Sequence, residues 1–213
     1  MLNSHYYSND WPDPPLTDTI ESRLTRLVWC NDIALGGGHH VNACIHAIDA
    51  ALWVAGARPV SAVGVSRVVR ADPHGDSHDV FAIVYEFADG LVLHHRGKHL
   101  RNLTEFQAAC EIQGQTGFGT ISYGGPVALK TPKGEYSGEV VTLYRDGAAH
   151  NIGVFYENVV RGDFKNPTVR RAVDSALTTI LGREACRRRT RLTMDQLLKE
   201  NQRLEVSLKG LKS

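Results

Sequence analysis

The segment 78–100 constrains the fold most, because it has the pattern of two paired strands. Along 78–87 the side chains alternate in direction, so that apolar residues fall on both faces of a strand. One face carries Val80, Ala82 and Val84, and the other carries Phe81, Ile83, Tyr85 and Phe87. Ala88-Asp89-Gly90 supplies a turn, and 91–100 returns as the partner strand. The sequence therefore predicts an antiparallel pair of strands in a hairpin.

More strand patterns surround this hairpin, and helical patterns lie before and after them. The further predicted strands are 60–70, 107–114, 119–123, 127–131 and 140–144, with turns at Lys133-Gly134 and Asp146-Gly147. The predicted helices are 41–55, stopped by Gly56; a segment around 152–159, stopped by Gly162; one opened by Asn166-Pro167; and one opened by the capping-box pair Thr193 and Gln196. Contiguous strands followed by helices predict an α+β fold with a mixed, mostly antiparallel sheet.

The N-terminus has a different composition. Residues 1–18 are polar and contain Pro12, Pro14 and Pro15, which is typical of an extended arm outside the core. We therefore predict an arm or linker over 1–28 and one domain over 29–213, a length that suits a single domain.

Charge and cysteine content exclude several classes of partner. The net charge of +1 gives no support for nucleic acid or a membrane surface as partner, and no apolar run is long enough to span a bilayer. The arginine-rich run 183–191 is typical of a solvated helix end. Four scattered cysteines without a C-x-x-C pair predict free thiols, a reducing compartment and a cytoplasmic protein.

The stretch 36–49, GGGHHVNACIHAID, carries the candidate chemistry. His39, Asn42, His46 and Asp49 follow at steps of three, four and three, which would place them on one stripe of a helix. The core-facing stripe would contain Val41, Cys44, Ile45, Ile48, Leu52 and Ala55. An imidazole, an amide and a carboxylate on the free face favour a binding or catalytic helix, with His46 suited to proton transfer near neutral pH.

Other kinds of site fit the sequence less well. The histidines 39, 40, 46, 94, 95 and 99 could be assembled into a zinc cluster, but His94 and His95 point to opposite faces of a strand and no zinc motif is present. We therefore predict no metal. The sequence has no G-x-S-x-G nucleophile motif, and no G-x-G-x-x-G follows a strand.

Several stretches together resemble one known family. GGGHHVNACIHAIDAALWVAGARPVSAVG, FAIVYEFADGLVLHHRGKHL, NPTVRRAVDSALTTILGREA and RLTMDQLLKENQRLEVSLKGLK are similar to the C-terminal domain of the glucose–fructose oxidoreductase and inositol dehydrogenase family (Gfo/Idh/MocA). The resemblance runs from about Trp29 to the C-terminus. It implies an open mixed sheet with helices on one face, a substrate pocket, and a homo-oligomer formed through the open sheet face.

The resemblance also implies a reaction. Family members transfer hydride between a sugar, cyclitol or polyol hydroxyl and NAD or NADP, which an N-terminal Rossmann domain binds. A lysine of that domain and a histidine of the second domain handle the hydroxyl proton, and His46 falls on that histidine. The sequence shows no match to the Rossmann domain or to that lysine, so we expect a fragment, a stand-alone descendant, or a chain whose first half a partner supplies. Asn42 stands where the family often has an acidic residue, and an amide cannot act as a base.

The sequence thus predicts the substrate-binding half of an NAD(P)-dependent oxidoreductase, inactive by itself. His46 would be the catalytic acid or base, and Asn42, His39 and Asp49 would contact the substrate. Asp49 fits equally well as a residue that orients His46 or as a structural cap. The alternative function is an inactive dimerisation or sugar-binding module.

Overall fold

The structure is a computed structural model, and it describes residues 1–9, 19–24, 28–70, 75–139, 142–165 and 167–210. The described residues form a nine-stranded sheet in the order β8-β7-β6-β5-β1-β4-β3-β2-β9. The strands are β1 Leu2–Ser8, β2 Ser61–Arg67, β3 Val80–Glu86, β4 Val92–His99, β5 Gln107–Gln113, β6 Phe118–Ser122, β7 Pro126–Thr131, β8 Gly134–Glu139 and β9 Leu192–Thr193. β1 runs parallel to β4, and the other pairings are antiparallel. The predicted α+β class with an open mixed sheet is confirmed.

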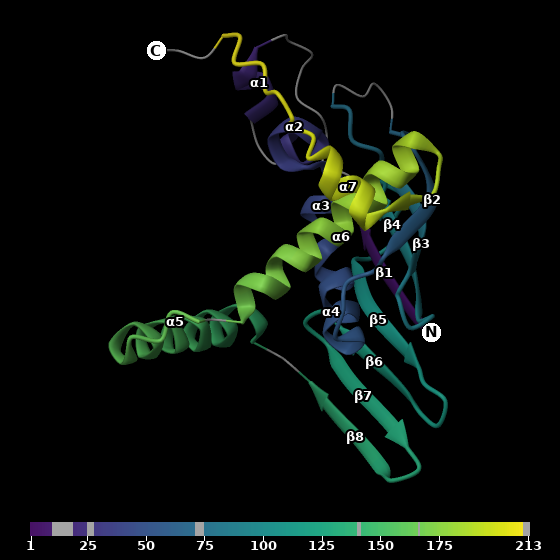
Figure 1. The fold of residues 1–213 in the computed structure, drawn as a ribbon, viewed down its shortest axis with the longest axis vertical. Helices are drawn as coiled ribbons and strands as arrows, with labels where there is room; N and C mark the ends of the chain where they lie inside the picture. The colour runs from purple at the N-terminus through teal and green to yellow at the C-terminus, as the bar shows by residue number, and fades with distance from the viewer. Residues whose placement is uncertain (10–18, 25–27, 71–74, 140–141, 166, 211–213) are drawn as a thin grey trace.

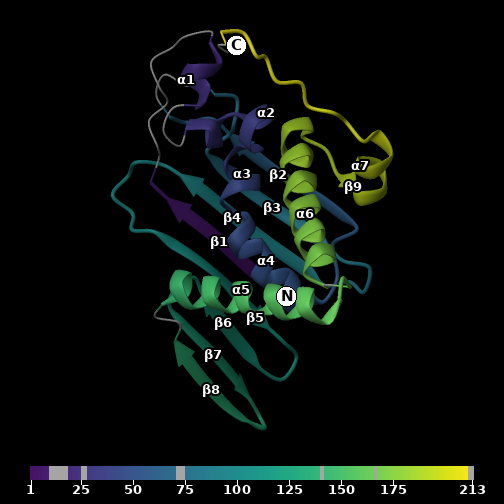
Figure 2. The same cartoon turned by 90° about the vertical axis from the view of Figure 1, so that its left-hand side faces the viewer.

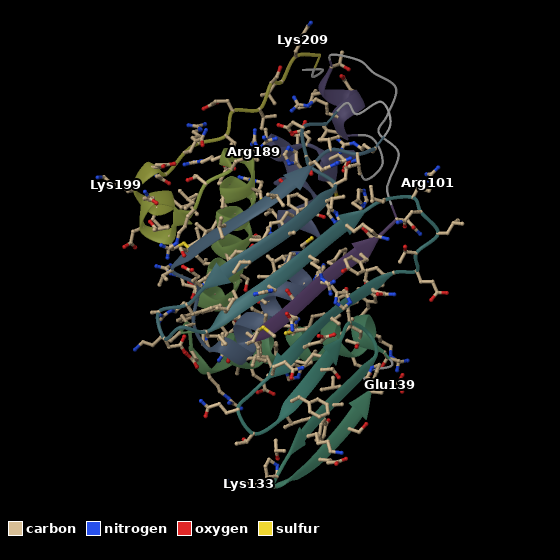
Figure 3. All side chains as sticks on the ribbon, turned by 90° about the vertical axis from the view of Figure 1, so that its right-hand side faces the viewer. Arg101, Lys133, Glu139, Arg189, Lys199 and Lys209 are labelled. Carbon is tan, nitrogen blue, oxygen red and sulfur yellow. The ribbon has the colours of Figure 1, made fainter. Side chains whose placement is uncertain are left out.

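Helices cover one face of this sheet (Figure 1). The described helices are α1 Ile20–Leu24, α2 Ile33–Gly36, α3 Gly38–Asn42, α4 Ile45–Ala55, α5 Leu143–Arg161, α6 Thr168–Arg188 and α7 Met194–Glu200, with a 3-10 turn at Val28–Asn31. Of these, α5 projects away from the sheet (Figure 1). α4 packs on β1 and β5, and α6 packs on β2 and β3. Figure 3 looks onto the opposite face, where the strands lie in front of the helices.

The alternation predicted for the central hairpin is confirmed. β3 pairs antiparallel with β4, and Phe81, Ile83 and Tyr85 are buried beneath the helices while Ala82 is exposed on the open face. The same alternation buries Leu93, His95 and His99 of β4 and leaves His94 exposed. The core between sheet and helices therefore contains histidines as well as apolar side chains.

The prediction of an N-terminal arm was wrong for Leu2–Ser8, which forms the central strand β1. Leu2 and Ser4 are each 2% exposed, and β1 lies between β4 and β5. The physical reason is that the inward positions Ser4 and Ser8 hydrogen-bond buried His95 and His99, so polar residues are satisfied in the interior. The prolines of the predicted arm lie outside the described residues.

The prediction of a strand at 140–144 was also wrong where the structure describes it. Thr142 precedes α5, and the helix continues through the expected turn at Asp146-Gly147 until Gly162, which adopts φ 67° as predicted for a helix stop. Residues 140–141 lie outside the described residues. Glycine costs an exposed helix only about 1 kcal/mol, so Gly147 weakens α5 without ending it.

The arginine-rich run is only partly solvated. Arg183 is 5% exposed, and its side chain donates to the Gly37 carbonyl oxygen (2.9 Å) and to Glu184 (2.9 Å). Arg183 therefore ties α6 to the glycine turn between α2 and α3, where Gly37 adopts φ 80°. The prediction of a solvated helix end was wrong for this residue, because it has a buried carboxylate and a carbonyl as partners.

Two glycines predict opposite stability changes. A Cβ added at Gly182 of α6 would overlap the hydroxyl of fully buried Tyr85, whereas a Cβ at Gly153 of α5 meets no atom within 4 Å. We expect Gly182→Ala to lower the free energy of unfolding by about 1–3 kcal/mol through overpacking. Gly153→Ala should raise it by about 0.5–1 kcal/mol. Urea unfolding measures both, and an unchanged midpoint for Gly182→Ala would contradict the close α6–β3 packing.

Candidate active-site surface

His46 lies near the start of α4, and its exposed imidazole packs among aromatic rings from distant parts of the chain. Its centroid is 6.1 Å from that of Tyr6 on β1 and 5.2 Å from that of Tyr123, just after β6. Phe106 contacts both tyrosines edge-on, with centroids at 5.3 and 5.8 Å. The fold thus holds His46 at the surface, with the rings of Tyr6 and Tyr123 packed beside its imidazole.

A cavity of about 180 Å³ lies beside His46. It is lined by His46, Ala47 and Ala50 of α4, by Ala108, Ala109, Ile121, Ser122 and Val127 of the sheet, and by Tyr123, Gly124 and Leu143. The lining is mainly apolar, with His46, Ser122 and Tyr123 as the side chains that offer polar atoms. Ligand sites commonly combine such an apolar wall with a few placed polar groups.

The surroundings of His46 keep its ring neutral at neutral pH. Partial burial against the aromatic rings lowers the pKa of His46 below its ordinary 6.5, and the Asp49 carboxylate opposes this shift. Burial and neighbouring phenols raise the pKa of Tyr123 to about 12, and its hydroxyl hydrogen-bonds that of Tyr144 at 2.9 Å. At neutral pH His46 is therefore a neutral imidazole that can accept a proton, and Tyr123 is a neutral phenol.

Asn42 and Asp49 each have a structural partner. The Cys30 thiol donates to Asn42 Oδ1 (3.2 Å), and the Ser175 hydroxyl donates to Asp49 Oδ1 (2.5 Å). Asp49 thus links α4 to α6 as a structural residue, while its charge also acts on His46. The substrate-binding roles predicted for both residues stay predictions.

The predicted single stripe of polar residues was wrong, because the predicted helix 41–55 is interrupted. The amides of Ala43 and Cys44 both donate to the His39 carbonyl oxygen, at 2.9 and 3.3 Å, and α4 starts anew after Cys44. Two donors on one carbonyl insert an extra residue into the turn, so later side chains are rotated away from the expected stripe.

His39 consequently lies in the interior and not beside His46 on the surface. Its side chain is 0% exposed, and its ring stacks on His99 with centroids 4.5 Å apart. The substrate contact predicted for His39 stays untested. We leave His39 out of the proposed binding surface because a substrate cannot reach it in this conformation.

Sequence reasoning missed the aromatic residues around His46. Tyr6, Phe106 and Tyr123 come from β1, the β4–β5 connection and the β6–β7 turn. Only the period of two in LNSHYYS could have signalled that 2–8 is a strand and brings Tyr6 into the sheet. His150 and Asn151, noted beside an apolar helical segment, lie exposed on α5.

The comparison with known families decides the assignment. The family model described as the GFO/IDH/MocA C-terminal domain matches residues 3–118, which is more than half of the chain. This chain belongs to the Gfo/Idh/MocA family. The match covers the helix that carries His46 and most of the sheet.

Solved structures share the fold of this Gfo/Idh/MocA domain at low sequence identity. The aldose-aldose oxidoreductase of Caulobacter crescentus is 15% identical, with a TM-score of 0.66 over 90% of this chain and 55% of its own. A putative myo-inositol dehydrogenase of Sinorhizobium meliloti is 15% identical, with a TM-score of 0.64 over 91% and 56%. Levoglucosan dehydrogenase in complex with NADH and levoglucosan is 15% identical, with a TM-score of 0.69 over 90% and 57%.

This domain therefore spans little more than half the length of these structures. No protein of curated function matches the chain in sequence. In the described part of the chain, no helix is both long and apolar enough to cross a membrane.

The described residues of this Gfo/Idh/MocA domain do not fit a nicotinamide dinucleotide by themselves. A dinucleotide unit needs a strand, a glycine-rich turn and a helix that leads to a neighbouring parallel strand. Here β1 and β4 are parallel, but β2 and β3 lie between them in the sequence, and β3 forms an antiparallel hairpin with β4. The glycine run Gly36–Gly38 joins two short helices and does not follow a strand. What the domain offers is a surface centred on His46.

Proposed function

We propose that this chain is the substrate-binding half of an NAD(P)-dependent oxidoreductase that acts on a hydroxyl of a sugar, cyclitol or related polyol. The observation that carries this proposal is His46, neutral and exposed at the edge of a cavity within the family's C-terminal domain. The names of structural neighbours, a levoglucosan dehydrogenase crystallised with NADH and an aldose-aldose oxidoreductase, support the substrate class.

In this proposal His46 handles the substrate proton. Oxidation of an alcohol removes the hydroxyl proton and a hydride from the same carbon, and a neutral imidazole accepts the proton. A nicotinamide bound by a separate Rossmann domain would take the hydride. In the reverse reaction the protonated imidazole returns the proton to the alkoxide oxygen.

The cavity wall has an apolar part and a polar part, and a carbohydrate ring likewise has apolar C–H groups and polar hydroxyls. The carbon-bound hydrogens of a sugar ring can lie against Tyr123, Ile121 and Val127, while its hydroxyls reach His46 and Ser122. Asn42 and Asp49 lie on either side of His46 in the sequence and are the next candidates for hydroxyl contacts. With an amide at position 42, His46 would accept the proton without help from a carboxylate there.

The purified chain is expected to bind no NAD+, NADH, NADP+ or NADPH and to oxidise no polyol by itself, because the described residues provide no dinucleotide unit. Isothermal titration calorimetry with the four nucleotides tests this expectation. Titration with levoglucosan, myo-inositol and glucose, followed by NMR at His46 and Tyr123, tests the substrate side. Micromolar nucleotide binding would refute the division of roles, and no sugar response at His46 would refute the substrate site.

The alternative function is an inactive module for dimerisation or sugar binding, and α5 favours it specifically. None of the α5 side chains is buried, although the helix carries a row of large apolar residues. The exposed row contains Tyr144, Ile152, Phe155, Tyr156, Val159 and Val160. Figures 1 and 2 together show that α5 projects from the helical side of the molecule, away from the sheet, so this row is available to a second chain.

Under either function we propose a homo-oligomer that uses the open sheet face, and a cytoplasmic location. Val63 and Val65 of β2 are exposed on that face, at 42% and 67%, next to exposed Ala82 of β3.

The proposed cytoplasmic location rests on the cysteines. Four buried free cysteines agree with the predicted reduced thiols.

A further inference from the structure

A second cluster of chemical interest lies inside the domain, away from the proposed substrate cavity. His40 of α3, Cys44 between α3 and α4, and His95 of β4 bring three ligand atoms within 4.8 Å of one another. All three side chains are at most 1% exposed. Two imidazoles and a thiol at this spacing form a common ligand set for transition metals.

The outer nitrogen of each imidazole has a hydrogen-bond partner that fixes the ring. His40 Nε2 lies 2.9 Å from the Tyr85 hydroxyl, and His95 Nδ1 lies 2.8 Å from the Ser4 hydroxyl. Metal-binding histidines usually have such a partner on the nitrogen that does not bind the metal, because it sets the tautomer and the ring orientation.

The inner nitrogens have no partner among the described residues. His40 Nδ1 and His95 Nε2 are buried without a hydrogen bond. Buried polar atoms without a partner are uncommon in folded proteins, and an unseen ion is one physical explanation.

Gly97 leaves room at the cluster. A Cβ at this position of β4 would lie 2.8 Å from Cys44 Sγ and 3.5 Å from His95 Nε2. The thiol and the unpartnered nitrogen therefore face the same space above a glycine. Cys44 follows His40 by four residues, and residues at this spacing lie on the same side of a helix, so the thiol lies beside the His40 ring.

The charge of the surrounding side chains favours a monovalent over a divalent metal ion at this cluster. The charged side chains that act on His40 and His95 are Arg183 and Arg96, and Arg183 is itself paired with the Glu184 carboxylate. A divalent ion bound by one thiolate and two neutral imidazoles would leave a net positive charge buried near arginine, which is costly. A monovalent ion with the same ligands is neutral, and thiolate with imidazole suits Cu(I).

We propose that His40, Cys44 and His95 form a buried three-coordinate site for a soft monovalent metal ion, Cu(I). Binding replaces the Cys44 thiol proton by the metal, so one proton is released and no electron is transferred. Because the site is enclosed, the ion enters as the chain folds and stabilises the folded state. The proposal does not depend on the function proposed for His46.

The test is anaerobic titration of the metal-free full chain with Cu(I), in competition with the chromogenic Cu(I) chelator bicinchoninate. We expect one Cu(I) per chain and a higher thermal unfolding temperature with Cu(I). X-ray absorption of the wild-type complex should give one sulfur and two nitrogen neighbours. A different ligand set, or no binding against the chelator, would overturn the site without any variant.

Variants locate the site. Cys44→Ser and Gly97→Ala should lower Cu(I) affinity at least tenfold, the first by removing the thiolate and the second by filling the space beside it. Cys110→Ser is the matched control, because Cys110 is an equally buried free thiol on β5 outside the cluster. Circular dichroism of each metal-free variant checks folding. Equal affinity of the Cys44 and Cys110 variants would reject the assignment, and tighter 1:1 binding of Zn²⁺ would reject Cu(I) as the ion.

Discussion

Replacement of His46 by glutamine is expected to lower kcat by about 10²–10⁴-fold when the domain works with a dinucleotide-binding domain, the usual contribution of one general base. The nicotinamide Kd should not change, because His46 belongs to the substrate side. Glutamine keeps a polar side chain between Tyr6 and Tyr123 but cannot accept a proton. Steady-state kinetics with a polyol substrate and nucleotide fluorescence titration measure the two effects.

His150→Gln is the matched control for this experiment. His150 is an exposed histidine on α5, far in sequence from the cavity and absent from its lining. Its replacement should leave kcat unchanged. Equal rates for wild type and His46→Gln would remove His46 from the reaction.

The pH dependence gives an independent measure of the same residue. Polyol oxidation requires neutral His46, so kcat/KM should fall as the pH drops through the His46 pKa, which burial places below 6.5. The Asp49 carboxylate raises that pKa, so Asp49→Asn should move the acid limb to lower pH. NMR titration of the His46 ring measures the shift on the chain itself. An unmoved pKa in Asp49→Asn would contradict the electrostatic link.

Asp79→Asn is expected to lower the free energy of unfolding by about 3–5 kcal/mol, a large share of the stability of an ordinary domain. Asp79 is fully buried and pairs with Arg70, whose side chain is 4% exposed. Its Oδ2 also accepts the backbone amides of Val69 (2.8 Å) and Arg70 (2.9 Å). Asparagine removes the negative charge that these donors share and weakens the pairing with buried Arg70.

The Asp79 side chain acts at a point where the ends of strands meet. The Asp79 backbone amide bonds the Arg67 carbonyl oxygen at the end of β2, and its carbonyl oxygen accepts the His99 amide at the end of β4. Urea unfolding measures the loss. Glu135→Gln is the control, since the Lys130–Glu135 pair is more than half exposed and should contribute less than about 1 kcal/mol. Similar losses in the two variants would show that burial of the Arg70 pair does not matter.

Local sequence patterns were reliable where one residue or one repeat decides the conformation. The period of two along β3 and β4 predicted which side chains share a face of the sheet, and Gly56 and Gly162 end their helices at positive φ. The Thr193–Gln196 capping box opens α7 as predicted. These features depend on backbone sterics and on neighbours within four residues, so a single sequence contains them.

Patterns of polarity failed where the interior of the protein is itself polar. Ser4 and Ser8 made 1–18 look like a solvated arm, yet each serine hydrogen-bonds a buried histidine of β4. The interruption at Ala43 and Cys44 leaves no mark in composition, because both residues are small and tolerate helical and non-helical turns. It separated His39 from His46.

The sequence by itself thus determined the α+β class, the family and His46 as the residue to test, because these depend on local repeats and short motifs. Only the tertiary structure decided which residues surround His46 and which histidines are buried together. Tyr6, Tyr123 and His46 are far apart in the chain, as are His40 and His95. Contacts of this kind depend on strand pairing and on one shifted helical turn, and no local pattern specifies either.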